Sequence, residues 1–550
     1  MEKKWVVRHD CRGLDTNEII DVILQDRGVE DIHALLYPDE SCLIPFEQMK
    51  NIDRAAKVIL DGIENNKKFL VYWDTDDDGC SAGAIATRWL RHNGANVITC
   101  INQGKEHGIA NADPVLLSSA DVLWIVDSIE TKIYPYENAF NFGVEQIVIT
   151  DHHLVSKSMQ KQMERTGRIM LVSSAVDYPN PALSGSATTW KLCQYMDWLQ
   201  LEDYSDNLID LAASGLIADM VDVGVESLEN RYICAKGFSN PVNPALKKIN
   251  GSYEYNSQAV SFGIAPLVNA ANRVNENEKV VQLFLSDDPK EINRLVGDLK
   301  ECKETQNLEI ADIMPQLEEQ AESQMDKKVM FFFVETENEV KGLLGNKLIE
   351  KYNRPVIVLS NRIQVDEETG EIIKHEYFGS ARAVGMPNFK KYIDDTGLAG
   401  SGGHENACGV WLDADVLDDF RNALEDALKD IKFIQETTVD IQLDLKQVTD
   451  DLIKKIKMLN RISGTGWPAI SVMISGITDY QVGAMSGGKH LKLIADDGKF
   501  LFIKWNYNGS WDQFDGELSA IGSLDSGCFG RTYYRQMIMS DWIIDNFKNL

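Results

Sequence analysis

A chain of 550 residues is too long for one hydrophobic core and predicts three or four domains. The apolar share of 44% excludes a disordered protein, and the formal net charge of −30 argues against a surface that is basic overall. From Glu436 onward, 12 basic side chains stand against 14 acidic ones, so a local polyanion-binding surface is least opposed there.

Targeting signals and cysteine motifs are missing from the sequence. The N-terminus has no signal-peptide core, and no apolar run is long enough to cross a bilayer, which predicts a cytoplasmic protein without a membrane anchor. The nine cysteines form no C-x-x-C pair, so we expect reduced thiols rather than a zinc or disulfide framework.

Helical apolar spacing in residues 1–65 predicts an N-terminal helical segment. A strand–helix alternation then begins. Short continuous apolar runs predict strands at 69–73, 95–101, 122–126, 146–150 and 168–172. Such runs, separated by helices, are typical of a parallel sheet covered on both faces, so residues 66–275 are predicted to form an α/β domain.

Acids and histidines follow three of these strands. Asp74, Asp76 and Asp78 alternate after the first, and at an extended strand end they would point the same way with Asp77 opposed. Further candidates are Asp127, Asp151, His152 and His153 at later strand ends, and Asp219 in a helix of small residues. Ligands bind beyond the carboxyl ends of such strands, so we expect these groups to converge. A solvated acidic loop, or a helix cap at Asp127 or Asp219, is the alternative.

Crowded carboxylates with imidazole suit divalent cations. We expect Asp74, Asp76, Asp78, Asp127, His152 and Asp219 to bind two ions, Mn²⁺ or Mg²⁺. Such a pair activates water and favours hydrolysis of a phosphoester. Adjacent His152 and His153 point apart, so one is expected to bind metal while the other donates to a phosphate oxygen or to Asp151.

The motif Asp151-His152-His153, with D-x-D-x-D-G at 74–79, resembles the DHH phosphoesterase superfamily. Tyr72 stands where the pyrophosphatase and short-oligonucleotide branches have histidine, and the additional acid Asp74 matches the RecJ exonucleases. Segments 183–187 and 211–223 are similar to RecJ motifs as well. The resemblance implies catalytic roles for Asp74, Asp151, His152 and His153.

Segment 266–273, P-L-V-N-A-A-N-R, is similar to the RecJ stretch P-R-x-N-A-A-G-R that faces the nucleic-acid strand. Leu267 and Asn272 depart from it, while Asn269 and Arg273 remain as implied substrate-binding residues. Ile129 replaces a glycine in the motif that keeps Asp127.

Residues 276–328 predict a connecting helix, started by Asp288-Pro289 and divided or kinked at Pro315. In 329–434, glycine clusters with Arg382 and His404 allow backbone N–H groups and charged donors to approach an anion, with ordinary glycine-rich turns as the alternative. The G-G-H-x-x-A-x-G form from Gly402 resembles the DHHA1 substrate-binding domain. It implies that Ser380, Arg382, Gly402, Gly403 and His404 grip a terminal nucleotide or its 5′-phosphate.

Short β-like runs in 435–550 predict a small barrel such as an OB-fold. Trp505 and Tyr507, interleaved with lysines, are candidates for stacking on single-stranded bases, with a core position as the alternative.

The predicted fold is therefore an α/β DHH domain, a long helix, an α/β DHHA1 domain and a C-terminal barrel. The resemblance implies a RecJ-like exonuclease that degrades single-stranded DNA from the 5′ end to mononucleotides, with a single-strand-binding protein or helicase as candidate partner. One alternative is a phosphodiesterase of short oligonucleotides or cyclic dinucleotides. The other is an inactive DHH scaffold in DNA replication, although all the expected acids are kept.

Overall fold

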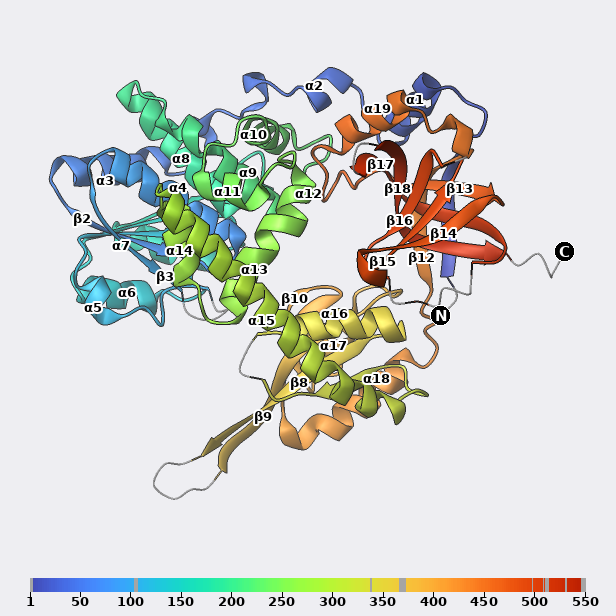
Figure 1. Cartoon of the computed structure of the whole chain (residues 1–550). Coiled ribbons are helices and arrows are strands. Elements are labelled where there is room, and N and C mark those ends of the chain that lie inside the picture. The colour runs from blue at the N-terminus through green and yellow to red at the C-terminus, as the bar shows by residue number, and fades with distance from the viewer. Residues whose placement is uncertain are drawn as a thin grey trace. The chain divides into compact units, whose positions relative to one another are not determined.

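The computed structural model of the chain describes residues 3–102, 107–336, 339–365, 372–496, 498–507, 509, 514–529 and 532–545. The chain divides into two compact units (Figure 1). The smaller unit comprises Met1–Val6, Arg273–Asn275 and Glu301–Thr438; the larger unit comprises Val7–Asn272, Glu276–Lys300 and Val439–Leu550. Among the described residues, no helix has the length and apolar character needed to cross a membrane.

The core of the larger unit is the predicted parallel sheet, with strand order β3-β2-β4-β5-β6. Its strands are β2 (Lys68–Trp73), β3 (Asn96–Ile101), β4 (Val122–Val126), β5 (Gln146–Asp151) and β6 (Ile169–Ser173). Trp73 pairs with Val126, and Val126 pairs with Thr150, so β2, β4 and β5 end at nearly the same level. The residues that follow these strands therefore emerge at one edge of the sheet.

Helices cover both faces of this sheet (Figure 1). On one face, Leu70 and Tyr72 pack with residues of α6 (Tyr134–Asn141) and α7 (Lys157–Thr166). Contacts on the sheet also come from α3 (Ile52–Glu64), α4 (Asp77–His92) and α8 (Gly185–Gln200). The other helices of this part are α1 (Thr16–Asp26), α2 (Ile32–Leu36), α5 (Pro114–Leu117), α9 (Ile209–Ala218), α10 (Leu228–Ser239), α11 (Pro244–Asn250), α12 (Ser257–Ala259), α13 (Ala265–Arg273) and α14 (Glu278–Leu285). A π-helical turn, η4 (Val260–Ile264), precedes α13.

The predicted connecting helix is α15 (Pro289–Glu322), which runs for 34 residues. Pro315 lies inside it, so the predicted division of the helix at this residue is wrong. A proline removes one backbone hydrogen bond, and the turns on either side are retained by packing of Ile310, Ile313 and Leu317 in the core of the smaller unit.

The smaller unit is built on a sheet of order β10-β11-β9-β8-β7. Its strands are β7 (Met330–Phe333), β8 (Val356–Val365), β9 (Ile372–Arg382), β10 (Gly400–His404) and β11 (Ala407–Asp413). One face packs on α15 and α16 (Lys341–Tyr352), and the other on α17 (Phe389–Asp395) and α18 (Leu417–Leu428).

The C-terminal segment forms an eight-stranded sheet of order β1-β12-β13-β17-β18-β16-β15-β14, mostly antiparallel, in agreement with an OB-like domain. Its strands are β1 (Lys3–Asp10), β12 (Gln435–Leu443), β13 (Val472–Ile477), β14 (Tyr480–Met485), β15 (His490–Ala495), β16 (Phe500–Lys504), β17 (Glu517–Phe529) and β18 (Thr532–Asp545). Strand β1 corrects the prediction of a purely helical N-terminal segment. Its partner β12 lies more than 400 residues away, so no local pattern announces the pairing.

Within the larger unit, the C-terminal sheet domain is joined to the parallel-sheet domain by an intimate contact. Trp467, which follows α19 (Asp450–Asn460), is buried, with the guanidinium carbons of Arg27 and Arg231 at 4.6 and 5.5 Å from its ring centroid. The backbone N–H of Val223 donates to the carbonyl of Thr465 at 2.9 Å. These two domains therefore share a core contact.

Candidate metal centre

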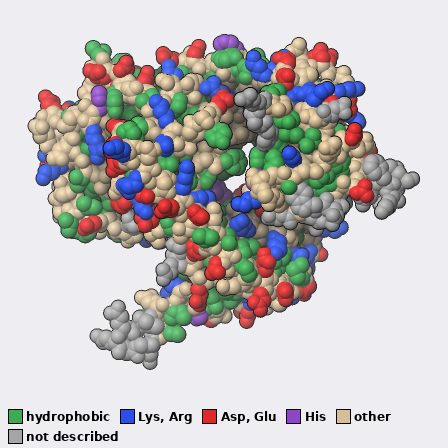
Figure 2. Space-filling model, viewed as in Figure 1, with side chains coloured by type: hydrophobic (Ala, Val, Ile, Leu, Met, Phe, Trp, Pro, Cys, Tyr) green, Lys and Arg blue, Asp and Glu red, His purple; other side chains and the backbone are tan. Residues whose placement is uncertain are grey.

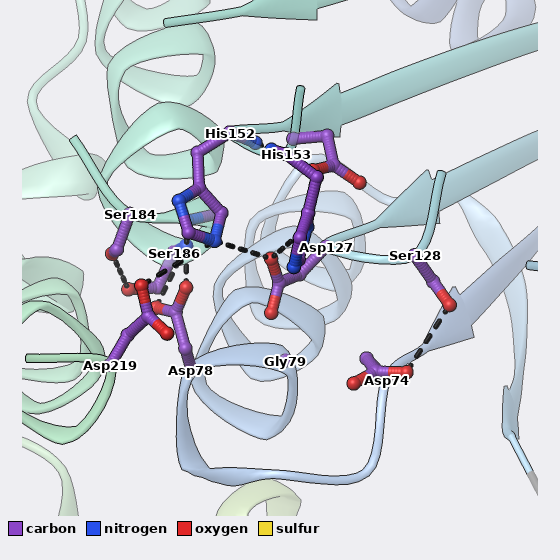
Figure 3. A network of polar contacts seen from close by, with 12 residues as sticks. Asp74, Asp78, Gly79, Asp127, Ser128, His152, His153, Ser184, Ser186 and Asp219 are labelled. Carbon is purple, nitrogen blue, oxygen red and sulfur yellow. Dashed lines mark hydrogen bonds and ion pairs between the residues drawn. The ribbon is translucent and has the colours of Figure 1, made fainter. Parts of the chain in front are cut away.

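Acids and histidines from four elements meet at the carboxyl edge of the parallel sheet (Figure 3). Three sets have ligand atoms that all lie within 4.8 Å of one another. They are Asp74 with Asp76 and Asp127; Asp127 with His152 and His153; and Asp78 with His152 and Asp219. All six predicted metal ligands thus lie in this cluster, and His153 joins them.

The turn after β2 is helical rather than extended. The Asp76 side chain accepts from the Gly79 N–H at 3.0 Å and caps α4, so Asp77 and Asp78 lie in the first helical turn. The expected strand-like alternation is therefore wrong, because the cap starts the helix four residues earlier than predicted. Asp77 belongs to none of the three ligand sets and accepts from Ser214 of α9 at 2.9 Å.

The start of α8 positions Asp78. Its carboxylate accepts from the backbone N–H groups of Gly185 and Ser186 at 2.7 and 3.1 Å. A Cβ at position 185 would lie 2.4 Å from Oδ1 of Asp127, so only glycine lets the helix approach this closely. The positive end of the α8 dipole therefore faces the acids. The need for glycine at position 185 and for free backbone N–H groups at the start of α8 explains the motif at 183–187.

Asp127 belongs to two of the three sets, and its backbone is unusual. Its φ of 54° is left-handed, a conformation that aspartate tolerates better than most residues. Asp127 Oδ1 and His152 Nε2 are buried, lack a hydrogen-bond partner and lie 3.4 Å apart. Figure 3 shows the His152 ring between Asp127 on one side and Asp78 and Asp219 on the other. Buried, unpaired nitrogen and oxygen atoms of this kind fit a transition-metal ion such as Mn²⁺.

The two adjacent histidines have opposite electrostatic environments. Burial lowers the pKa of His152, which favours the neutral imidazole that a metal requires. Burial would also lower the pKa of His153, but its hydrogen bond to Asp151 at 2.8 Å raises that pKa to about 9. His153 is therefore a cation at neutral pH, with Nε2–H free of the Asp151 contact.

Asp151 positions both histidines instead of joining the ligand sets. Its buried carboxylate accepts from the backbone N–H groups of His152, His153 and Ile129 at 2.6–2.7 Å. Burial would raise the pKa of Asp151, but His153 lowers it to about 2. Asp151 thus fixes the backbone of the D-H-H segment and the orientation of the His153 ring.

The remaining carboxylates repel one another. Burial and the neighbouring Asp74 and Asp78 raise the pKa of Asp76 to about 6. Burial and Asp78 raise the pKa of Asp219 to about 8. Burial raises the pKa of Asp127 well above its usual range. Cations placed among these groups would relieve the repulsion, so the donor set fits bound divalent ions.

Sequence reasoning missed three residues around Asp74 and Thr75. Ser128 donates to Asp74 at 3.2 Å, and His107 Nδ1 lies 3.4 Å from the same carboxylate oxygen. Asn272, noted only as a departure from the RecJ pattern, donates to Thr75 at 2.9 Å. His107 follows no predicted strand directly. The only local sign in the sequence is the neighbouring Gly108, which adopts a left-handed φ of 99° in the structure.

The predicted substrate-binding residues of the smaller unit share one sheet. Gly402 pairs through Gly409 with Ser380, and His404 pairs through Ala407 with Arg382. Arg382 donates to the Ser380 hydroxyl at 2.6 Å. Gly403, between the two rows, has a left-handed φ of 114°.

Positive charge gathers in the smaller unit. The pKa of Arg273 is lowered by burial and by nearby Arg382, and that of Lys303 by burial and by Arg273 and Lys347. Cationic side chains that lower one another's pKa values in this way would be stabilised by a bound anion. Lys303 was not anticipated, since it stands in an acidic helix. Asn269 lies half-buried on α13 in the larger unit.

The two predicted stacking residues differ in exposure. Trp505 is 45% exposed and contacts His490 edge-on, with ring centroids 4.9 Å apart. Tyr507 is buried against Phe514 and Trp542, so its prediction as a stacking residue is wrong. The alternation of aromatic residues after β16 does not distinguish the inward from the outward ring. Figure 2 shows acidic and basic side chains interspersed over the visible face, without one dominant basic patch.

Comparison with known proteins identifies two domains. The model of the DHH family, N-terminal domain, matches residues 68–216, and the model of the DHHA1 domain matches residues 326–430. A putative SPbeta prophage-derived single-strand DNA-specific exonuclease, YorK, of Bacillus subtilis is 28% identical over 473 residues, covering 79% of this chain and 78% of the relative. The single-stranded-DNA-specific exonuclease RecJ of the same organism is 26% identical over 469 residues, covering 82% of this chain and 56% of the relative.

Solved structures agree with the fold. The crystal structure of RecJ in complex with Mn²⁺ from Thermus thermophilus superimposes with a TM-score of 0.75 at 21% identity. The match covers 99% of this chain and 80% of that one. A second crystal structure of the same protein, in complex with Mg²⁺, has a TM-score of 0.69.

Proposed function

The chain is RecJ-like, with a DHH domain followed by a DHHA1 domain, and from this premise we propose that it is a metal-dependent exonuclease of single-stranded DNA. The observation that carries the proposal is the position of Asp127, which belongs to two sets of ligands around the same buried edge. A shared carboxylate is suited to two neighbouring ions. Degradation from the 5′ end with release of mononucleotides is proposed from the resemblance to RecJ.

Bound there, a pair of divalent ions supplies an activated water and neutralises charge on the phosphoryl group. The chain's own residues hold and orient the reacting groups. His153, kept protonated by Asp151, donates from Nε2 to a phosphate oxygen. Neutral His152 and the surrounding carboxylates serve as ligands, while α8 fixes Asp78.

We propose that the smaller unit binds the strand through its phosphates. Support comes from Arg382, which is pre-positioned by Ser380 and by Asn346, and from the mutual repulsion of Arg273, Arg382 and Lys303. Gly402, Gly403 and His404 offer backbone and ring donors beside this row. Because the chain carries a net charge of −30, such a cluster must act locally.

The C-terminal sheet domain is proposed to bind bases of longer strands through the exposed ring of Trp505. A cytoplasmic location, and a single-strand-binding protein or helicase as partner, are proposed on the same resemblance.

The test is digestion of single strands labelled at the 5′ or the 3′ end, with Mn²⁺, with Mg²⁺ and with a chelator. We expect the 5′ label to leave first as a mononucleotide and chelation to stop the reaction. Asp127→Asn should abolish turnover. Asp113→Asn, at the exposed cap of α5, is the matched control and should leave it unchanged. Exclusive turnover of dinucleotides would favour the short-oligonucleotide phosphodiesterase instead.

A further inference from the structure

Trp411 presents an exposed ring on the same face of the smaller unit's sheet as the residues proposed to bind phosphate. In antiparallel pairs, directly opposite side chains share a face. Trp411 pairs with Phe378 of β9 and with Gly400 of β10, so it lies in register with both neighbours. It is 50% exposed, whereas the alternate residues of β11, Cys408, Val410 and Leu412, are buried in the core.

The indole of Trp411 lies against a strand of glycines. A Cβ at Gly400 would lie 2.3 Å from the indole nitrogen, and a Cβ at Gly402 would lie 3.6 Å from the far end of the ring. The missing side chains let the ring rest on the β10 backbone. The ring therefore has a supporting surface on one side and solvent on the other, and little conformational entropy remains to be lost when a planar group stacks on it.

The residues next along the sheet are those proposed to bind a phosphate. We call the residues that lie directly opposite one another on β9, β11 and β10, with side chains on this face, a row. Ser380 and Gly402 lie one row away from Trp411, and Arg382 and His404 lie two rows away. Each row is about 7 Å along the strand, so about 14 Å separates the backbone of Trp411 from that of Arg382. The indole spans part of this distance, because its far edge reaches Gly402. The guanidinium of Arg382 reaches back to Ser380 at 2.6 Å, so the distance left between the indole edge and this cation is shorter than the backbone spacing and can be spanned by one nucleotide.

The charged side chains around Trp411 limit which groups can bind beside its ring. In the row beyond Trp411, Asp413 and Glu376 lie beside Arg362, and Glu376 also pairs with Lys374 at 2.7 Å, so charges of both signs stand on the side away from Arg382. Beside Trp411, the ring of Phe378 is covered by the Lys341 ammonium at 4.6 Å and the Arg362 guanidinium at 4.3 Å. The face of the Phe378 ring is thus already covered by Lys341 and Arg362, whereas the Trp411 ring remains exposed. A phosphate is favoured at Arg382, whose guanidinium donates to the neutral oxygens of Asn346, Ser380 and Ala381.

We propose that Trp411 stacks on the base of the terminal nucleotide whose phosphate is bound by Ser380 and Arg382. This rests on the proposed function and adds to it a base-binding position that accepts any base, because every base has a π-face. Trp411 is a positioning residue in this scheme, holding the end of the strand by its base while Arg382 holds it by charge.

The test uses a thymidine strand that carries a 5′-phosphate and 2-aminopurine as its first base, bound in the presence of a chelator so that no hydrolysis occurs. Stacking quenches 2-aminopurine fluorescence. We expect binding to quench the wild-type signal, Trp411→Ala to lose the quenching with about tenfold weaker binding, and Trp411→Phe to retain most of both. The matched control is Trp198→Ala, which removes another exposed tryptophan, on α8, and should change neither.

The outcomes separate the two proposals. Equal quenching by the wild type and Trp411→Ala, in a protein that degrades single strands with Mn²⁺, overturns the stacking site and leaves the exonuclease intact. Loss of binding by Trp411→Phe as well as Trp411→Ala, with unchanged melting temperatures, also contradicts stacking, because phenylalanine retains a π-face. A wild-type protein that neither binds nor degrades the strand overturns both.

Discussion

Replacing Asp76 by asparagine separates the structural role of this residue from its charge. Asn is as good an N-cap as Asp, so the hydrogen bond from Gly79 and the start of α4 should survive. What disappears is a carboxylate whose pKa is raised to about 6 by burial and by its acidic neighbours. The variant should therefore be more stable without metal and inactive with it.

The gain in stability of Asp76→Asn can be calculated from the pKa shift of Asp76. A pKa raised from 3.8 to about 6 means that the folded state keeps a proton that the unfolded state has released. At pH 8 the ionised group then destabilises the metal-free fold by about 3 kcal/mol, because one pKa unit corresponds to about 1.4 kcal/mol. For a cooperative unit of about 400 residues, this is a rise in melting temperature of about 3–4 °C for Asp76→Asn.

The assay is thermal unfolding at pH 8 in chelator and in Mn²⁺, together with hydrolysis of a labelled single strand. Mn²⁺ should raise the melting temperature of the wild type more than that of Asp76→Asn, and hydrolysis by the variant should fall at least a hundredfold. Asp31→Asn, at the exposed cap of α2, is the control and should change neither. A metal-free Asp76→Asn protein that melts below the wild type would refute the electrostatic reasoning.

Three further outcomes are expected. His152→Gln should raise the Mn²⁺ concentration needed for half-maximal turnover, whereas His153→Gln should lower turnover at saturating Mn²⁺ by about 10²–10³-fold; equal metal titrations for both would contradict their separate roles. The metal-free protein should lose stability as pH rises from about 4 to 8. The cause is that Asp219, with a pKa of about 8, and its neighbours keep protons in the folded state that the unfolded state releases. Excess Mn²⁺ should flatten this dependence of the melting temperature on pH. Trp505→Ala should weaken binding of a long strand about tenfold in a fluorescence-anisotropy titration while Trp505→Phe binds nearly as the wild type, and unchanged binding by Trp505→Ala would exclude the proposed stacking.

The parallel sheet and the convergence at its edge were predictable because both depend on local patterns. Continuous apolar runs identify buried parallel strands, and the carboxyl ends of such strands meet. Asp127 and Asp151 could therefore be placed from their position after a strand. Their different roles could not, because these depend on which N–H groups surround each carboxylate: Asp151 accepts from three backbone amides, and Asp127 Oδ1 from none.

What escaped prediction depends on contacts distant in sequence. His107 reaches Asp74 through a loop, and β1 joins β12 across more than 400 residues. Tyr507 and Trp505 look equivalent in the sequence, yet one faces the core and the other solvent. The helical start at Asp77 was misjudged because the cap that Asp76 provides overrides the strand-like alternation of the acids.

Trp467 bears on how this protein can be shortened or recombined with a relative. Arg231 of α10 and Arg27, which follows α1, both stack on a ring supplied by the C-terminal domain, and Arg27 also pairs with Asp440 there. Removing the C-terminal domain would therefore take away the ring that covers both guanidiniums and the carboxylate that pairs with Arg27. A shortened protein that lost activity would report collapse rather than the loss of a binding surface. Exchange of modules with a relative would have to carry this tryptophan and its arginines together, as one inherited set.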